Sequence, residues 1–263
     1  MRTAVALDRQ LQQYVRAVAP FGRDTARIGP FLATFQPSNA ATYANYAIPD
    51  DDARPTAADV AALVAAYEQR DRVPRLEYLP GAAPAVEAVL LAGGFVAEAR
   101  LPAMVCDRDT LVATAPPAGI ELAAPVDDDE LYALSAAQHA AFGDDPPDAA
   151  AVARLRAMLD AGAVAILARD RATGETVGGG TATIPSGGVT EIAGIGVRAS
   201  HRRRGIAGAI TARVTADAFA TGDTTLAFLT PGDASAHRVY ARAGFAEATV
   251  MIHISRPRDP ATR

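Results

Sequence analysis

The feature that most constrains this chain is an internal repeat, because two related halves must each close a fold of the same kind. Residues 76–95 (LEYLPGAAPAVEAVLLAGGF) align with residues 226–245 (LAFLTPGDASAHRVYARAGF) at a constant offset of 150, and both segments end in Gly-Phe. Without a gap, the same offset places residues 42–47 on the strand-like segment 192–197, and the helix-like segment 56–70 on 206–220. The sequence therefore predicts a tandem duplication.

The boundary between the halves is predicted from a loss of pattern. The chain has 263 residues, which is enough for two lobes of ordinary domain size. Residues 107–119 (DRDTLVATAPPAG) have no hydrophobic periodicity and contain two consecutive prolines, which favour an extended connector over a helix. We therefore predict one lobe over residues 1–110 and a second lobe over residues 119–256.

Hydrophobic patterning in the second half predicts alternating strands and helices. Strands are expected at 121–125, 163–169, 176–184, 189–197, 224–230 and 245–254, and helices at 128–141, 148–161, 204–220 and 234–243. The third of these helices has an apolar residue at every fourth position: Ile206, Ile210, Val214 and Ala218. The first half has a comparable apolar face, made of Val60, Leu63, Val64 and Tyr67. These patterns predict an α+β fold with two tandem lobes, each a mixed central β-sheet flanked by helices.

Composition excludes several classes of protein. Half of the residues are hydrophobic and 21% are charged, so the chain can bury a sizeable core. The formal net charge of -5 argues against a broad nucleic-acid-binding surface. The single cysteine, Cys106, allows no internal disulfide and no thiolate cluster, and no His, Asp or Glu grouping has the spacing of a metal site. Because no long apolar stretch or leader pattern is present, we expect a cytoplasmic protein without a membrane span.

A basic segment in the second half has the features of an anion site. Residues 197–209 (VRASHRRRGIAGA) run from a predicted strand through a loop of arginines and small residues directly into a helix. A helix N-terminus offers unpaired N–H groups and a partial positive charge, and small residues let a phosphate approach them. The segment has neither the lysine of a nucleotide-binding loop nor the glycine order of a dinucleotide fold. It predicts a pyrophosphate site; the alternative is a solvated basic turn that caps a helix.

Two motifs in this half resemble the GNAT superfamily of N-acetyltransferases. The phosphate signature of that family, Arg/Gln-x-x-Gly-x-Gly/Ala, follows a strand that ends in valine. The residues that match it are Val197, Arg202, Gly205 and Ala207. A second family signature is a helix that ends in tyrosine and is followed by Gly-Phe, and it is similar to Tyr240, Gly244 and Phe245. The resemblance covers about residues 121–254.

The resemblance implies that acetyl-CoA is the acyl donor and that the acetyl group passes directly to an amine, without a covalent enzyme intermediate. The pyrophosphate would lie on the amides of residues 203–208, and the pantetheine along the strand that ends at Val197. Asp233 stands where the family often has asparagine, and a carboxylate accepts hydrogen bonds but cannot donate one. The implied contact residues are Ile195, Gly196, Val197, Arg202, Arg203, Arg204, Gly205, Ile206, Ala207, Gly208 and Asp233.

Two residues are candidates for proton transfer. An alkylammonium acceptor must lose a proton before it attacks a thioester, so a general base is useful. Glu191 lies six residues before Val197, similar to the place of a catalytic glutamate in several family members; the alternative is a strand-end carboxylate that faces solvent or pairs with an arginine. Tyr240 matches the family tyrosine thought to protonate the departing thiolate; the alternative is an ordinary core tyrosine.

The first half lacks the features of the phosphate loop. At the offset of 150, the arginines of residues 202–204 correspond to Asp52, Ala53 and Arg54, and Gly205 corresponds to Pro55. Carboxylates would repel a pyrophosphate, and proline has no N–H to offer. We therefore predict a degenerate GNAT-like lobe that has no coenzyme A site and that supports the catalytic lobe.

Three functions remain open from the sequence. The preferred one is an acetyl-CoA-dependent N-acetyltransferase that acts on a small-molecule amine or an amino-acid-like acceptor, as a monomer or homodimer. The alternatives are a non-catalytic acyl-CoA binding or sensing module and a protein N-acetyltransferase. The identity of the acceptor, the preferred acyl chain and the oligomeric state are not encoded in any motif, because acceptor pockets are built from variable loops.

Overall fold

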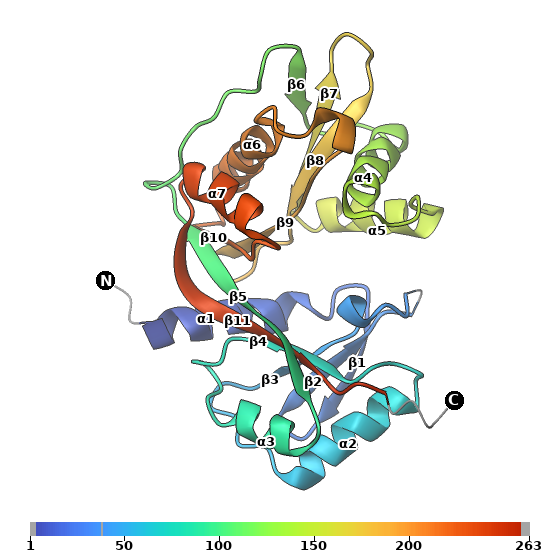
Figure 1. Ribbon diagram of the computed structural model, residues 1–263, viewed down its shortest axis with the longest axis vertical. Helices are drawn as coiled ribbons and strands as arrows, with labels where there is room; N and C mark the ends of the chain where they lie inside the picture. The colour runs from blue at the N-terminus through green and yellow to red at the C-terminus, as the bar shows by residue number, and fades with distance from the viewer. Residues whose placement is uncertain (1–3, 38, 259–263) are drawn as a thin grey trace. The chain divides into compact units, whose positions relative to one another are not determined.

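The computed structural model describes residues 4–37 and 39–258 and divides the chain into two compact units (Figure 1). Unit 1 comprises the described residues up to Ala103 together with those from Ala248 onward, and unit 2 is Met104–Glu247. The sequence predicted lobes at 1–110 and 119–256. In the structure the division falls inside two long strands, Val96–Cys106 and Ala246–Ser255, each of which has residues in both units.

Unit 1 is a mixed sheet with three α-helices. Its strands follow the order β1-β2-β3-β4-β11-β5; β3 and β4 are parallel, and the pairs β1-β2, β2-β3 and β4-β11 are antiparallel. The elements are α1 (Ala4–Val18), β1 (Asp24–Ile28), β2 (Phe31–Phe35), β3 (Ala47–Pro49), α2 (Ala57–Glu68), β4 (Arg75–Tyr78), α3 (Val86–Ala92) and the first part of β5 (Val96–Cys106).

Unit 2 repeats this arrangement with one additional strand. Its order is β5-β10-β9-β8-β7-β6, in which only β9 and β10 are parallel. The elements are β6 (Ile120–Ala123), α4 (Asp128–Phe142), α5 (Ala149–Asp160), β7 (Val164–Asp170), β8 (Thr176–Ala182), β9 (Val189–Val197), α6 (Ile206–Ala220), β10 (Leu226–Leu229), α7 (Ala234–Arg242) and the first part of β11 (Ala246–Ser255).

The final strand of each repeat pairs outside its own repeat. The end of β5 runs antiparallel to β10, with Cys106 opposite Ala227. The end of β11 runs antiparallel to β4, with Ile254 opposite Leu76. Because β4 and β10, like β5 and β11, are equivalent at the offset of 150, the two pairings are reciprocal.

The elements confirm the repeat from α2 onward and correct it before that helix. Helices α2 and α6 begin one residue apart once the offset is removed, and both predicted apolar faces are buried. The segment 42–47 was matched to a strand, but Thr42–Ala44 forms a 3-10 helix, and β3 begins only at Ala47. The Asn45 side chain explains this difference, because its amide group donates to the carbonyls of Asn39 and Ala41 and so stabilises a local turn.

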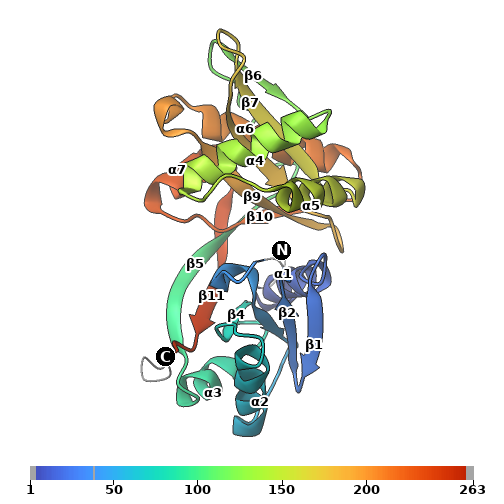
Figure 2. The ribbon, with the colours of Figure 1, turned by 90° about the vertical axis from the view of Figure 1, so that its right-hand side faces the viewer.

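Two helix layers enclose the sheet of unit 2 (Figure 2). Successive residues of a strand point to opposite faces, and the glycine run in β8 shows which helix covers each face. A Cβ atom at Gly179 would lie 1.8 Å from Leu134 of α4, whereas one at Gly180 would lie 2.7 Å from Ile210 of α6. Helices α4 and α6 therefore pack on opposite faces, and the missing side chains of β8 permit both to approach closely.

Candidate active site

Strands β9 and β10 part within unit 2. They pair at three positions only, from Leu226 opposite Val189 to Phe228 opposite Glu191. Strand β9 then continues for six more residues to Val197 and stays paired with β8 on its other side. The edge of β9 from Ile192 to Val197 therefore has no ladder partner on β10 within the described residues. Such an edge presents backbone N–H and C=O groups that an extended ligand can bind.

A β-bulge lies on this open part of β9. Gly179 pairs with Gly196 and Thr181 pairs with Ala193, so the single residue Gly180 is opposite two residues of β9. One of these two, Gly194, has φ = 63°, a backbone conformation that favours glycine. The other is Ile195, whose side chain packs with the core on the α6 side. Of the predicted contact residues, Ile195 thus lies in the bulge, and Gly196 and Val197 follow it directly.

The loop from β9 to α6 presents a row of backbone amides without internal partners. Within the described chain, no intramolecular hydrogen bond is formed by the amide N–H groups of residues 203–208. Arg203 has φ = 61° and Gly205 has φ = 85°, and such left-handed positions curve consecutive amides into an anion-binding concavity. Gly205 is the N-cap of α6 and provides no side chain to cap the helix. The predicted residues Gly205, Ile206, Ala207 and Gly208 therefore form an open helix N-terminus.

The three arginines of this loop have different surroundings. Arg202 donates from Nε to the carbonyl of Val197 at 3.1 Å and from Nη2 to the carbonyl of Ala141 at 2.7 Å. Its guanidinium therefore ties the loop to the end of α4, which differs from the expected role of charge beside a phosphate. Arg203 and Arg204 are exposed, and no partner is recorded for their side chains in the described part of the chain. These two arginines keep all their donors for an anion.

Asp233 has a local structural role. It is the N-cap of α7, and its Oδ1 atom accepts a hydrogen bond from the amide of Ala236 at 2.7 Å. This bond satisfies one of the orphan donors of the helix. One carboxylate oxygen is thus engaged, and the other can only accept, so any contact from Asp233 to a ligand must come from a ligand donor.

Glu191 lies at the last position where β9 and β10 pair, directly before the strands part. Its backbone is fixed by Thr183, whose amide donates to the Glu191 carbonyl at 2.9 Å. Its side chain is only partly buried. The carboxylate therefore emerges from a rigid part of the strand at the start of the open edge.

Tyr240 lies on the inner side of α7. It is half-buried and packs against the apolar cluster that includes Val214, Ala243 and Phe245. Burial, and to a smaller extent the negative charge of Asp233, raises the pKa of the phenol to about 12. The hydroxyl therefore remains protonated at neutral pH and can donate a proton.

The equivalent helix end in unit 1 is closed by its own side chains. Thr56 and Asp59 form a capping box at the start of α2: Thr56 Oγ1 accepts from the Asp59 amide, and the Asp59 carboxylate accepts from the Thr56 amide. These bonds hold the pKa of Asp59 below its usual value. In the preceding loop, Asp50 and Asp52 form ion pairs with arginines of unit 1. At this end of α2, side chains thus cap the helix and the two aspartates of the loop are paired with arginines, unlike the uncapped start of α6.

Gln138 of α4 was missed by the sequence analysis. Its side-chain amide donates from Nε2 to the carbonyl of Gly194 in the bulge at 2.8 Å. A Cβ atom at Gly194 would lie 2.4 Å from the same side chain, and one at Gly196 would lie 2.9 Å from Ala141. The end of α4 therefore supports the open edge of β9 from behind. A glycine inside a predicted strand was the only signal in the sequence.

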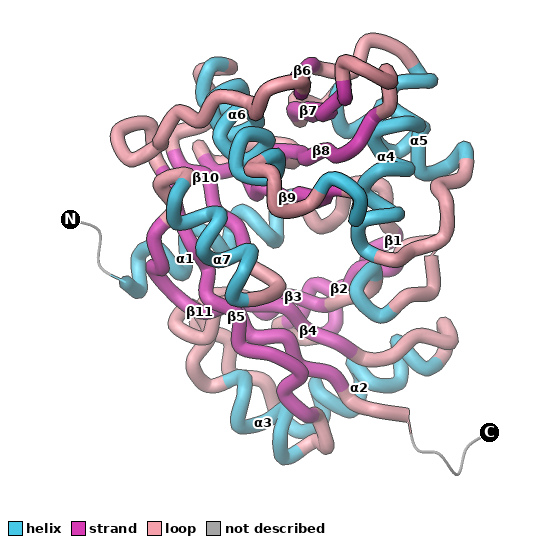
Figure 3. Tube along the Cα trace, turned by 45° about the horizontal axis from the view of Figure 1, so that its top comes forward, coloured by secondary structure: helices cyan, strands magenta, loops and turns pink. Residues whose placement is uncertain are grey.

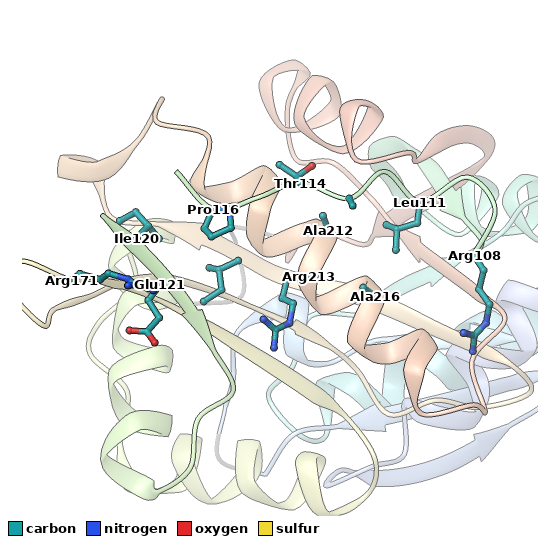
Figure 4. A pocket seen from close by; sticks show the side chains of 12 residues that line it. Arg108, Leu111, Thr114, Pro116, Ile120, Glu121, Arg171, Ala212, Arg213 and Ala216 are labelled. Atoms are coloured by element: carbon teal, nitrogen blue, oxygen red, sulfur yellow. The ribbon is translucent and has the colours of Figure 1, made fainter. Parts of the chain in front are cut away.

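A cavity of about 420 Å³ lies elsewhere in unit 2 (Figure 4). Helix α6, strand β6, the connector before β6 and Arg171 in the turn after β7 line it. None of its lining residues belongs to the open edge of β9 or to the loop before α6. Among the described residues, no group of three or more His, Cys, Asp or Glu side chains could hold a metal ion. In the same part of the chain, no helix has the length and apolarity needed to cross a membrane.

Comparisons with known proteins place most of the second half of the chain in a known family. Residues 129–245 match the model of the Acetyltransferase (GNAT) family, which includes α4, the open edge of β9, the loop before α6 and Tyr240. No protein with a curated description matches the chain.

Solved structures resemble the whole chain. A GCN5-related N-acetyltransferase from Kribbella flavida is 26% identical, with a TM-score of 0.80 and 96% of each chain covered. A GCN5-related N-acetyltransferase from Sphaerobacter thermophilus is 19% identical, with a TM-score of 0.63 and coverage of 89% of this chain and 84% of that chain. A tandem GNAT protein from the clavulanic acid biosynthesis pathway is 15% identical, with a TM-score of 0.63 and coverage of 93% and 88%. The last two likenesses concern the fold. Residues 129–245 thus match the GNAT family of acetyltransferases, and the similarity of the chain to a solved N-acetyltransferase supports an acyltransferase.

Proposed function

We propose that unit 2 binds acetyl-CoA and transfers its acetyl group to the amine of a small molecule or an amino-acid-like acceptor. The observation that carries this proposal is the row of unpaired amides at residues 203–208, in front of an uncapped helix. The positive end of the helix and the free guanidinium groups of Arg203 and Arg204 favour a pyrophosphate there. The open edge of β9 would pair with the pantetheine arm.

The residues at the edge of β9 and on α7 suit direct transfer. The Glu191 carboxylate would accept a proton from the acceptor ammonium, directly or through water, and so release the amine lone pair. The amine nitrogen then attacks the thioester carbonyl and the new C–N bond forms. The C–S bond breaks, and the nitrogen loses its second proton to water. Tyr240 would donate its proton to the departing thiolate, because its raised pKa keeps the hydroxyl protonated.

Charge at the third residue of α6 gives a sharp test of binding. We expect wild-type protein to bind acetyl-CoA in calorimetry with a Kd in the range of about 1 µM to 1 mM that is usual for substrates. Gly208→Asp should weaken this binding at least about tenfold, whereas the isosteric Gly208→Asn keeps the same size without the charge. A carboxylate at this position favours helix stability, so lost binding would not reflect lost folding. Equal affinities for the two variants would contradict the proposal.

A turnover assay distinguishes an acetyltransferase from a non-catalytic acyl-CoA sensing module. Thiol release from acetyl-CoA is to be followed with a panel of small amines, amino acids and peptide N-termini. Acceptor-dependent release with a small amine supports the proposed reaction. Saturable binding without release from any acceptor would favour a non-catalytic acyl-CoA module, and release with peptides alone would favour a protein N-acetyltransferase.

We also propose that unit 1 has no coenzyme A site. The capping box of Thr56 and Asp59 and the paired aspartates of the preceding loop support this proposal. Calorimetry should then give a stoichiometry of one acetyl-CoA per chain. A stoichiometry of two would overturn the proposal without affecting the role of unit 2.

A further inference from the structure

The cavity in Figure 4 has an apolar floor and a long, irregular roof. Ala212 and Ala216 lie one turn apart on α6, and their short side chains leave space above the helix. The apolar side chains of Ile120 and Leu122, from β6, line the side of the cavity. The roof is part of the connector between β5 and β6, which has neither helix nor strand in residues 107–119 (Figure 3).

The roof is fixed mainly at its two ends. Near its start, the amide of Val112 donates to the carbonyl of Ala243 at 3.1 Å. Near its end, the carbonyl of Gly119 accepts a hydrogen bond from the amide of Arg171 at 2.8 Å. Between these bonds, residues 113–116 are exposed and make no recorded backbone hydrogen bond within the described chain. This stretch can adjust to a ligand without the loss of sheet or helix hydrogen bonds.

Three arginines and a single carboxylate line the cavity, so its charge is positive. Arg171 and Arg108 lie at opposite ends of the row of lining side chains, with Arg213 between them (Figure 4). Arg213 is paired through Nε with Asp217, and its two terminal nitrogens have no recorded partner in the described chain. Arg108 binds the carbonyls of Phe219 and Thr224, which are neutral, and therefore keeps its charge. Arg171 has no recorded side-chain partner among the described residues, and Glu121 is the carboxylate.

We propose that this cavity is a second binding site, for a small organic carboxylate with an apolar body. Its volume of about 420 Å³ falls within the range of roughly 300 to 1,000 Å³ that is typical of small-molecule sites. The alanines of α6 and the apolar side chains of β6 would cover the apolar body of the ligand. Guanidinium groups match the planar geometry of a carboxylate, and Arg171 offers a complete set of free donors. This site is separate from the proposed acetyl-CoA site and does not depend on it.

The test uses the full chain and two probes that differ only in charge, octanoate and octylamine. Amide chemical shifts are to be recorded by NMR while each probe is titrated. We expect octanoate to bind with a Kd below about 1 mM and octylamine at least about tenfold more weakly. The shifts should concentrate at residues 113–122 and 212–216. Like affinities for the two probes, or no saturation by octanoate, would overturn the proposal.

Three variants locate the site. Ala216→Met fills the cavity from an exposed helix position, and Arg171→Ala removes the free guanidinium; each should weaken octanoate binding at least about tenfold. Arg154→Ala, at an exposed position of α5 outside the cavity lining, is the matched control and should leave the affinity unchanged. Thermal unfolding checks that all three variants are folded. If octanoate binds a folded Ala216→Met variant as tightly as wild type, the cavity is not the site.

Discussion

At the scale of single residues, the shape of β9 depends on a side chain from another element. Gln138 binds the carbonyl of Gly194, and in a trans peptide the following N–H, that of Ile195, points in the opposite direction. The amide of Ile195 is therefore turned away from α4. Gln138 thus acts as a positioning residue for the edge along which the pantetheine arm is proposed to lie.

We expect Gln138→Ala to weaken acetyl-CoA binding about fivefold, the equivalent of roughly 1 kcal/mol for one lost hydrogen bond. The effect should appear in the Kd from calorimetry and in KM, with a smaller change in kcat. Gln69→Ala is the matched control, because Gln69 is an exposed glutamine at the end of α2 in unit 1. An affinity equal to that of the control would remove the positioning role and leave the proposed function intact.

Tyr240 gives a prediction about pH as well as rate. Replacement by phenylalanine should lower kcat at least about 100-fold if the phenol protonates the thiolate, while the Kd for acetyl-CoA changes little. Because the pKa of Tyr240 is raised to about 12, the folded enzyme keeps this proton through pH 10. The rate of wild-type enzyme should therefore show no loss from tyrosine ionisation below about pH 11. A full kcat in Tyr240→Phe would show that another donor acts.

At the scale of elements, the acetyltransferase domain depends on how closely α4 approaches β8. The glycine run 178–180 is associated with two features, a close approach of α4 and a bulge on β9. The missing side chain at Gly179 leaves room for Leu134 of α4. The bulge lies on the neighbouring strand β9, opposite Gly180. The position of α4 in turn determines where Gln138 and Ala141 meet β9 and the loop before α6.

We expect Gly179→Ala to lower the free energy of unfolding by about 1–3 kcal/mol, because its Cβ atom would overlap Leu134 and force α4 away from the sheet. Urea unfolding measures this change. Gly232→Ala is the control: no atom lies within 4 Å of the added Cβ there, and the backbone is not left-handed. Equal stability of the two variants would show that the α4 interface tolerates the extra methyl group.

Local sequence patterns predicted the helices and strands well, but they did not predict which distant segments contact one another. The helix from Arg204 and the strand 189–197 were predicted within two residues of α6 and β9, because apolar periodicity and turn residues are local signals. The open helix end at Gly205 could also be inferred from its neighbours. The bond from Gln138 to Gly194 and the tie from Arg202 to Ala141 could not, since both join segments more than 50 residues apart in the chain.

At the scale of the whole molecule, the repeats cannot be separated at the connector without a loss to both sheets. A cut between residues 110 and 119 leaves β10 without the end of β5, and leaves β4 without the end of β11. All four residues of β10 are buried, so the loss exposes an apolar strand edge.

We expect the fragment 119–263 to aggregate when expressed alone, because the edge of β10 lacks its partner. Co-expression with the fragment 1–110 restores every strand and should give a soluble complex that elutes as one species in size-exclusion chromatography. Acetyl-CoA binding by that complex checks that the site is intact. A monodisperse, folded 119–263 fragment on its own would contradict the prediction.

The pairing of β4 with the end of β11 also sets the order of events during synthesis. Residues 75–78 leave the ribosome long before residues 252–255, which complete their edge. At typical rates of roughly 5 to 20 residues per second, the delay is on the order of ten seconds or more. The edge of β4 that pairs with β11 therefore stays unpaired through most of translation. A chaperone that binds nascent chains and covers strand edges should raise the yield of native protein.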